Sequence, residues 1–153
     1  MSCVLGFTAW GDKCIINGDL MDNYIPAIRN LCRDVLNGES IFYSWNYGGG
    51  MNTSLYNAYY SFSPLNVLYL IFYNCKVDLV TVACIVIKTG LAAMCFQVFV
   101  SRVNGVDGLM SVIFSLFYAM CSFQVAYNVS NIIWLDAMYM LPLVCVGVYR
   151  RWN

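Results

Sequence analysis

The stretch that decides the fold is residues 79–100, LVTVACIVIKTGLAAMCFQVFV, an apolar run whose only charged residue is Lys88. A helix rises about 1.5 Å per residue, so about 20 apolar residues cross a hydrocarbon core of about 30 Å. Two later stretches pass the same test: Gly108–Tyr127, which has no charge, and Ile132–Tyr149, which ends just before two arginines. The sequence therefore predicts three membrane-spanning helices.

The composition supports this prediction and excludes several classes of protein. Hydrophobic residues make up 61% of the chain and charged residues 10%, whereas soluble domains are about half apolar and about a quarter charged. The net charge is zero, so no basic surface indicates nucleic acid as a partner. The chain has no histidine, and its eight cysteines contain no C-x-x-C spacing, which argues against a zinc or redox motif. Proton transfer would fall to a carboxylate, Lys, Tyr or Cys.

Basic residues beside the spans predict the orientation, because short cytoplasmic loops carry an excess of Lys and Arg. The turn after the first span holds Arg102, and the third span ends at Arg150 and Arg151. Both places are therefore expected on the cytoplasmic side. By alternation, we expect a multi-pass protein of the cell membrane in which residues 14–77 form an extracytoplasmic loop.

The chain is predicted to have three regions. Residues 1–13 are interpreted as the remnant of a first span, because the opening stretch is apolar but too short to cross and lacks the features of a signal peptide. Residues 14–77 form the loop, and residues 78–153 form the three-helix membrane segment. Three helices hardly enclose a site by themselves, so we expect the chain to be a fragment of a longer protein.

One amphipathic helix is predicted inside the loop, from Leu20 to Leu36, where apolar positions recur at helical spacing. Such a helix is expected to lie along the membrane surface. Asp19 is placed to cap its first turn, Asp22 stands three residues later as in a capping box, and Gly38 follows the last turn as a stop signal.

The rest of the loop is rich in aromatic residues and glycine. The three glycines at 48–50 predict a turn and not a phosphate loop, because no Lys followed by Ser or Thr comes after them. Trp45 and the neighbouring tyrosines either stack on sugar faces or anchor the chain at the membrane interface. A Ser-Pro pair at 63–64 predicts the start of a short interfacial helix that runs to about Tyr73.

Two carboxylates in the loop are candidates for chemistry. Asp19 and Asp22 follow the predicted remnant of a span, and a carboxylate there is suited to act as general base towards a hydroxyl, or to bind a metal that neutralises a phosphate leaving group. A purely structural role of Asp19 as a helix cap explains the same spacing. Both interpretations stand at the level of the sequence.

Two charged residues lie within the predicted spans. Asp136, near the outer end of the third span, either faces the protein interior or sits at headgroup depth beside Trp134. Lys88 lies in the middle of the first span, where an unpaired charge costs several kcal/mol. Unless the side chain snorkels to the interface, a buried ion pair or a substrate contact is therefore expected for Lys88.

Five groups of short motifs occur in a fixed order along nearly the whole chain. They are GDL at 18–20, YIP at 24–26, FYS at 42–44 with GGGMN at 48–52, YY at 59–60 with SPLN at 63–66, and WLDA at 134–137 with LP at 141–142. In order and spacing they resemble the bacterial YfhO family of membrane proteins. That family in turn looks like the GT-C superfamily of glycosyltransferases, which take sugars from polyprenyl-phosphate carriers on the outer face of the membrane.

The resemblance implies a fold, partners and a catalytic residue. The chain would be the amino-terminal part of an all-α, GT-C-like membrane enzyme, and its partners would be the lipid bilayer, a polyprenyl-phosphate-linked sugar and a cell-envelope polymer such as teichoic acid. An acidic residue in the first outer loop is usually essential in GT-C enzymes, and the matching position is Asp19. One departure is Asn23, where relatives commonly have Gln before the Tyr; the shorter side chain reduces its reach.

The first hypothesis is thus a lipid-linked-sugar glycosyltransferase. Asp19 and Asp22 would be its catalytic acids, with Asp19 as the ligand of a divalent metal ion if one is used. The residues expected to bind substrate are Tyr24, Arg29, Arg33, Trp45, Lys88 and Asp136, with the two arginines as fixed cations for phosphate. The second hypothesis is a non-enzymatic transporter, flippase-like or scaffold component in which Lys88 and Asp136 hold helices together.

Overall fold

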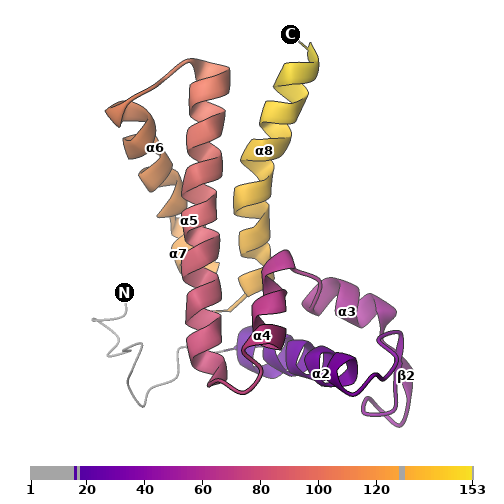
Figure 1. The fold of residues 1–153 in the computed structure, drawn as a ribbon. Helices are drawn as coiled ribbons and strands as arrows, with labels where there is room; N and C mark the ends of the chain where they lie inside the picture. Colours follow the sequence, from indigo (N-terminus) through magenta and orange to yellow (C-terminus); the bar gives the residue numbers. More distant parts are fainter. Residues whose placement is uncertain (1–15, 17, 128–129, 153) are drawn as a thin grey trace. The chain divides into compact units, whose positions relative to one another are not determined.

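The computed structural model describes residues 16, 18–127 and 130–152 (Figure 1). Within these ranges the chain is almost entirely helical, with one short hairpin of two strands. It divides into two compact units, residues 1–84 and 85–153, whose boundary lies inside the long helix α5 (Val77–Asn104). The predicted remnant of a first span at residues 1–13 lies outside the described residues.

The predicted amphipathic helix is confirmed at both ends. It consists of one π-helical stretch, η1 (Leu20–Tyr24), which continues directly as α2 (Ile25–Leu36). Gly38 has φ +69°, and the amide of the following residue donates to the carbonyl of Asp34 at 2.8 Å. A left-handed residue that turns the chain back onto the last helical carbonyls is the usual glycine stop, so the stop prediction is also confirmed.

The prediction that Asp19 and Asp22 form a capping box is wrong. Asp19 has helical backbone angles, φ −55° and ψ −31°, and its side chain makes no capping hydrogen bond, whereas a capping residue normally has an extended backbone. The first free amides, those of Met21 and Asp22, donate instead to the backbone carbonyl of Gly18 at 2.9 and 3.0 Å. The carboxylate of Asp19 is thereby left available for another role.

A hairpin that was not predicted follows α2. Strand β1 (Tyr43–Ser44) pairs antiparallel with β2 (Met51–Asn52), and the glycines at 48–50 form the predicted turn with positive φ. A Cβ at Gly50 would lie 2.9 Å from the ring of Trp45 and would collide with the Tyr43 hydroxyl. Strands of two residues are too short to show an alternating pattern in the sequence.

Three short helices complete the first unit: α3 (Ser54–Tyr60), η2 (Pro64–Asn66) and α4 (Val67–Ile71). The predicted Ser-Pro start is confirmed, because Ser63 is extended and Pro64 is the first helical residue, although the helix ends at Ile71 and the Ser63 side chain makes no capping bond. The buried hydroxyl of Tyr69 on α4 lies 2.8 Å from that of Thr81. This hydrogen bond ties α4 to the first turns of α5.

The second unit contains the remainder of α5, then α6 (Leu109–Ala119), α7 (Ser122–Tyr127), η3 (Ile132–Trp134) and α8 (Leu135–Trp152). Within this unit α5, the α6–α7 pair and α8 run up, down and up in Figure 1. Three helical segments are long and apolar enough to cross a membrane, namely Val77–Asn104, Leu109–Tyr127 and Ile132–Trp152. The prediction of an all-α membrane protein with about three spans is confirmed.

The middle span is interrupted, which the sequence did not indicate. Helix α6 ends at Ala119 and α7 starts at Ser122, with no proline or glycine between them. Earlier in the same span, the hydroxyls of Ser111 and Ser115 donate to the backbone carbonyls three and four residues before them, at 2.9 and 2.6 Å. Such local bonds satisfy serine hydroxyls inside an apolar span.

Replacing Gly50 with Ala is expected to destabilise the first unit by about 1–3 kcal/mol, because the new methyl group meets Trp45 and the Tyr43 hydroxyl at a positive φ. Thermal unfolding of the detergent-solubilised protein, followed by tryptophan fluorescence, measures the change. Gly90→Ala is the matched control, since Gly90 lies in α5 with open space around it. An unchanged unfolding temperature for Gly50→Ala would contradict the tight packing of the hairpin.

Candidate functional site

The first group of predicted site residues lies at the start of the amphipathic helix. Asp19 is exposed, and its Oδ1 accepts a hydrogen bond of 3.2 Å from the side-chain amide of Asn23. Asp22 is also exposed and makes no side-chain hydrogen bond or ion pair in the described part of the chain. Asn23 thus orients the candidate catalytic carboxylate.

Behind this acidic end lies a cluster of tyrosines. The ring of Tyr24 is 1% exposed and packs edge-on against Tyr60, with 5.1 Å between the centroids. Tyr60 in turn contacts Tyr56 and Tyr59, each at 4.7 Å, and Tyr47 continues the cluster beside Tyr56. The cluster packs against the buried Tyr24 at the end of the helical stretch that follows Asp19.

The ionisation of Tyr24 reflects this position. Burial is the largest cause that raises its pKa, followed by a hydrogen bond and charge interaction with Tyr59 and by the charges of Tyr60 and Asp19. Tyr24 therefore remains a neutral phenol at physiological pH, and its burial gives it a supporting role in this structure.

The two predicted phosphate-binding arginines stand one turn apart on α2 but have different partners. Arg29 donates to the backbone carbonyl of Tyr73 at 2.7 Å, and its guanidinium lies 4.4 Å from the centre of the Tyr73 ring. Arg33 forms an ion pair of 3.2 Å with the buried carboxylate of Asp34. Arg29 is held by neutral groups, so its charge is less compensated than that of Arg33.

Trp45 offers an accessible aromatic face. Its side chain is 74% exposed and stands edge-on to Tyr43, with 5.2 Å between the ring centroids. The turn glycine Gly50 lies against the same ring. A flat ring fixed by a hairpin is suited to stack on a sugar face or to sit at a membrane interface.

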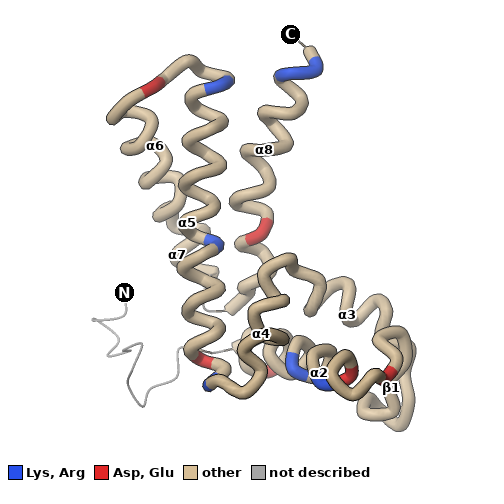
Figure 2. Tube along the Cα trace, in the orientation of Figure 1, with Lys and Arg blue, Asp and Glu red and all other residues tan. Residues whose placement is uncertain are grey.

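The second group of predicted residues forms a buried ion pair within the membrane unit. The ammonium of Lys88, on α5, lies 2.8 Å from Oδ1 of Asp136, on α8, and Lys88 is completely buried. Figure 2 marks the basic and acidic positions of these two helices along the Cα trace. The ammonium also donates to the carbonyl of Ile132 at 2.9 Å. The buried ion pair expected for Lys88 is present, and the expected substrate contact stays a prediction.

The interrupted middle span contributes a further polar group. Gln124 on α7 is buried and donates to the hydroxyl of Thr89, the residue next to Lys88, at 2.8 Å. Each of the three spans therefore supplies a buried polar side chain to the second unit: Lys88, Gln124 and Asp136. Sequence analysis did not single out Gln124, although a glutamine within an apolar span was a usable signal.

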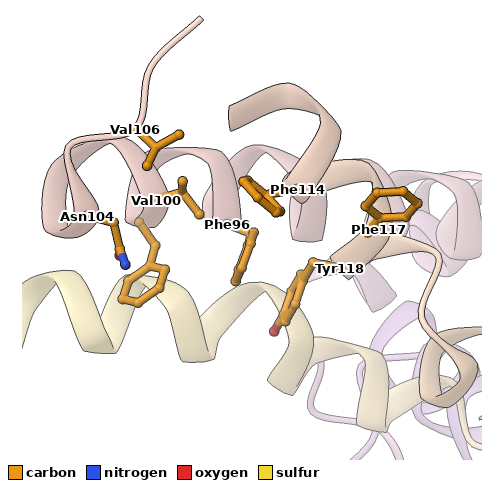
Figure 3. A pocket seen from close by; sticks show the side chains of 8 residues that line it. Phe96, Val100, Asn104, Val106, Phe114, Phe117 and Tyr118 are labelled. Carbon is orange, nitrogen blue, oxygen red and sulfur yellow. The ribbon is translucent and has the colours of Figure 1, made fainter. Parts of the chain in front are cut away.

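The aromatic pocket of the second unit carries little chemistry. It has a volume of about 480 Å³ between α5 and α6, and Figure 3 shows the side chains that line it. Phe96 of α5 stacks on Tyr118 of α6, with 4.2 Å between centroids, and the Tyr118 hydroxyl donates to the carbonyl of Met138. Its lining is apolar apart from Asn104 and Tyr118, and it contains no carboxylate.

A metal site is not built from side chains in the described part of the chain. No group of three or more His, Cys, Asp or Glu residues lies close enough together there to hold an ion. Asp19 and Asp22 alone would leave a divalent ion to complete its coordination with phosphate oxygens and water, which is common for Mg²⁺. Metal dependence therefore stays a prediction.

Comparison with known protein families gives a match over the full length of the chain. The family model described as bacterial membrane protein YfhO matches residues 1–153, the whole chain. No curated protein and no solved structure matches the chain.

Removing one partner of the buried ion pair is expected to destabilise the second unit. Asp136→Asn leaves the ammonium of Lys88 uncompensated inside the membrane, at a cost of about 2.5–3.5 kcal/mol. The double variant Lys88→Met with Asp136→Asn should be less destabilised than the sum of the two single variants. Thermal unfolding in detergent measures all three.

Lys76→Met serves as the control for these variants, because Lys76 is exposed and should tolerate the change within about 0.5 kcal/mol. Strict additivity of the two single variants would show that the contact between Lys88 and Asp136 contributes no coupling energy.

Proposed function

The chain belongs to the bacterial YfhO family of membrane proteins, and from this premise we propose that it is part of a membrane glycosyltransferase. The enzyme would transfer a sugar from a polyprenyl-phosphate carrier to a cell-envelope polymer, such as teichoic acid, at the outer face of the membrane. The observation that carries the proposal is the state of Asp19, an exposed carboxylate that caps no helix and is oriented by Asn23.

Asp19 is suited to act as the general base. It would accept the proton of an acceptor hydroxyl while that oxygen forms its bond to the anomeric carbon, and the bond from this carbon to the phosphate oxygen would break. The electron pair of the broken bond remains on the polyprenyl phosphate, which is the leaving group. Asp22, one helical turn further along, would assist by adding negative charge near the same hydroxyl.

The cations of α2 would bind the carrier phosphate. Arg29 lies ten residues after the proposed base Asp19, about 15 Å along a helix axis, so phosphate and acceptor hydroxyl would be bound at different points of this helical segment. The neutral partners of Arg29 leave its charge for the phosphate, while Arg33 shares its charge with Asp34. Trp45 would stack on the sugar or on a neighbouring acceptor unit.

Substituting Asp19 with Asn keeps the shape of the side chain and its contact with Asn23 but removes the base. Sugar transfer by the full-length protein from a polyprenyl-phosphate donor should fall by a factor of about 10²–10⁴, with the unfolding temperature unchanged because Asp19 is exposed. Glu39→Gln, a change at another exposed acid of the same unit, should retain full activity. Wild-type turnover by Asp19→Asn would end the proposal.

The proposed reaction requires residues 14–77 on the outer face. Basic residues at the carboxyl ends of α5 and α8, namely Arg102, Arg150 and Arg151, support a cytoplasmic position for those two ends.

A small epitope inserted in the glycine turn beside Tyr47 tests this orientation. It should be accessible to an impermeant antibody in spheroplasts without lysis, since the turn is expected outside. A second epitope placed after Trp152 is the control and should be detected only after lysis. Detection of the turn epitope only after lysis would reverse the orientation.

A second candidate function is supported by the buried ion pair. In a transporter, flippase-like or scaffold component, Lys88 and Asp136 would hold two spans together and no transfer chemistry would occur. This alternative predicts that Asp19→Asn leaves activity intact, whereas Lys88→Leu disturbs assembly or transport. The two substitutions therefore separate the two classes of function.

A further inference from the structure

A small cavity in the first unit lies between α2 and α4. Its volume is about 190 Å³, and it is walled on one side by apolar residues of α2 that include Ile28, Leu31 and Val35. None of the residues predicted for catalysis or substrate binding lines it. The cavity therefore shares no lining residue with the site proposed around Asp19.

Three polar side chains from one turn of chain also line the cavity. Ser61, Ser63 and Asn66 are exposed by 2, 8 and 8% respectively. The two serine hydroxyl oxygens and the amide oxygen of Asn66 are buried and have no hydrogen-bond partner among the described residues. Buried oxygens usually have partners, and three unpaired ones within six residues are unusual for a folded protein.

The geometry of this turn determines which hydrogen bonds each of the three side chains can still make. The amide nitrogen of Asn66 donates to the backbone carbonyl of Ser61 at 2.7 Å, which fixes the amide and leaves its oxygen as an acceptor only. The serine hydroxyls donate and accept, and rotation about χ1 moves each hydroxyl between staggered positions. A group that both donates and accepts is needed to pair with all three.

The lining also limits the charge of a ligand. It contains no Lys, Arg, Asp or Glu, so an ionised group would be buried without a counter-charge. The apolar side chains opposite the serines favour C–H surfaces. Hydroxyl groups beside a C–H face, without charge, are the chemistry of a sugar ring or of the glycerol part of a neutral lipid.

We propose that the cavity between α2 and α4 binds an uncharged, hydroxyl-bearing group, with Ser61, Ser63 and Asn66 hydrogen-bonded to its hydroxyls. The site does not depend on transfer chemistry at Asp19. Two sources share this chemistry, a free or polymer-bound sugar and a neutral glycerolipid, and the probes below distinguish them.

Alkylation of Cys32 reports whether the cavity is occupied. Its thiol is free and 5% exposed, and the residue lines the cavity, whereas Cys75 in the same unit is free and exposed. Alkylation of each cysteine by N-ethylmaleimide is followed by peptide mass spectrometry on the full-length protein in lipid nanodiscs. The probes are methyl glucopyranoside for a sugar, monooleoylglycerol for a glycerolipid, and methyl glucuronide as the charged analogue.

At a probe concentration of ten times Kd, alkylation of Cys32 should slow by about tenfold, and that of Cys75 should not change. Methyl glucuronide should give no protection. Ser63→Ala should weaken the apparent affinity by about fivefold, since one hydrogen bond is lost, and it should fold normally because the removed hydroxyl is unpaired. Ser54→Ala, a change outside the cavity, should have no effect.

The probe that slows alkylation of Cys32 identifies whether the cavity binds a sugar or a neutral glycerolipid. Failure of both neutral probes to slow Cys32 alkylation would overturn the proposal and would assign the unpaired oxygens to bound water alone. Protection that survives unchanged in both Ser61→Ala and Ser63→Ala would also overturn it. Asp19→Asn should leave the protection intact, so loss of transfer activity and loss of this binding are separate results.

Discussion

Polar groups inside a hydrocarbon layer must find partners within the protein, because no water is present to replace them. The second unit follows this constraint at several places. The charge of Lys88 is compensated by Asp136, Gln124 donates to Thr89, and serines of α6 donate to their own backbone. The arrangement of the spans within this unit therefore follows from a few polar contacts more than from its apolar surface.

Apolar packing alone does not specify how these spans associate. In their most apolar windows only 28, 22 and 33% of the residues are buried, so most of each helix surface is available to lipid or to other protein. Lipid tails are about as apolar as leucine and give helices little reason to associate. A buried ion pair costs desolvation energy, but it pairs two spans in one register. Holding two spans in register is a structural role of Lys88 that requires no contact with a substrate.

In the first unit, the residues that pack together differ from the residues proposed to carry out the reaction. Its tyrosines pack into an aromatic cluster around the buried ring of Tyr24, while its acidic residues at the start of the amphipathic helix remain exposed. Asp19 does not cap the helix, because the backbone amides of Met21 and Asp22 donate to the carbonyl of Gly18. The side-chain amide of Asn23 donates to the Asp19 carboxylate and orients it. An acid that contributes little to folding is free to serve a reaction, which is consistent with the function proposed for the YfhO family member.

The sequence by itself determined the three spans, the helix over residues 20–36 with its glycine stop at Gly38, and the proline start at residue 64, because each depends on local periodicity or on one residue's backbone preference. It also showed that Lys88 needs a partner. One sequence hypothesis already placed Lys88 and Asp136 together, but only the tertiary structure established that contact. It also added the Ile132 carbonyl, 44 residues away, as a second partner, and it showed that Tyr24 is buried and that Asp19 caps nothing. Those outcomes depend on contacts between distant segments, and local sequence patterns carry no information about which distant groups meet.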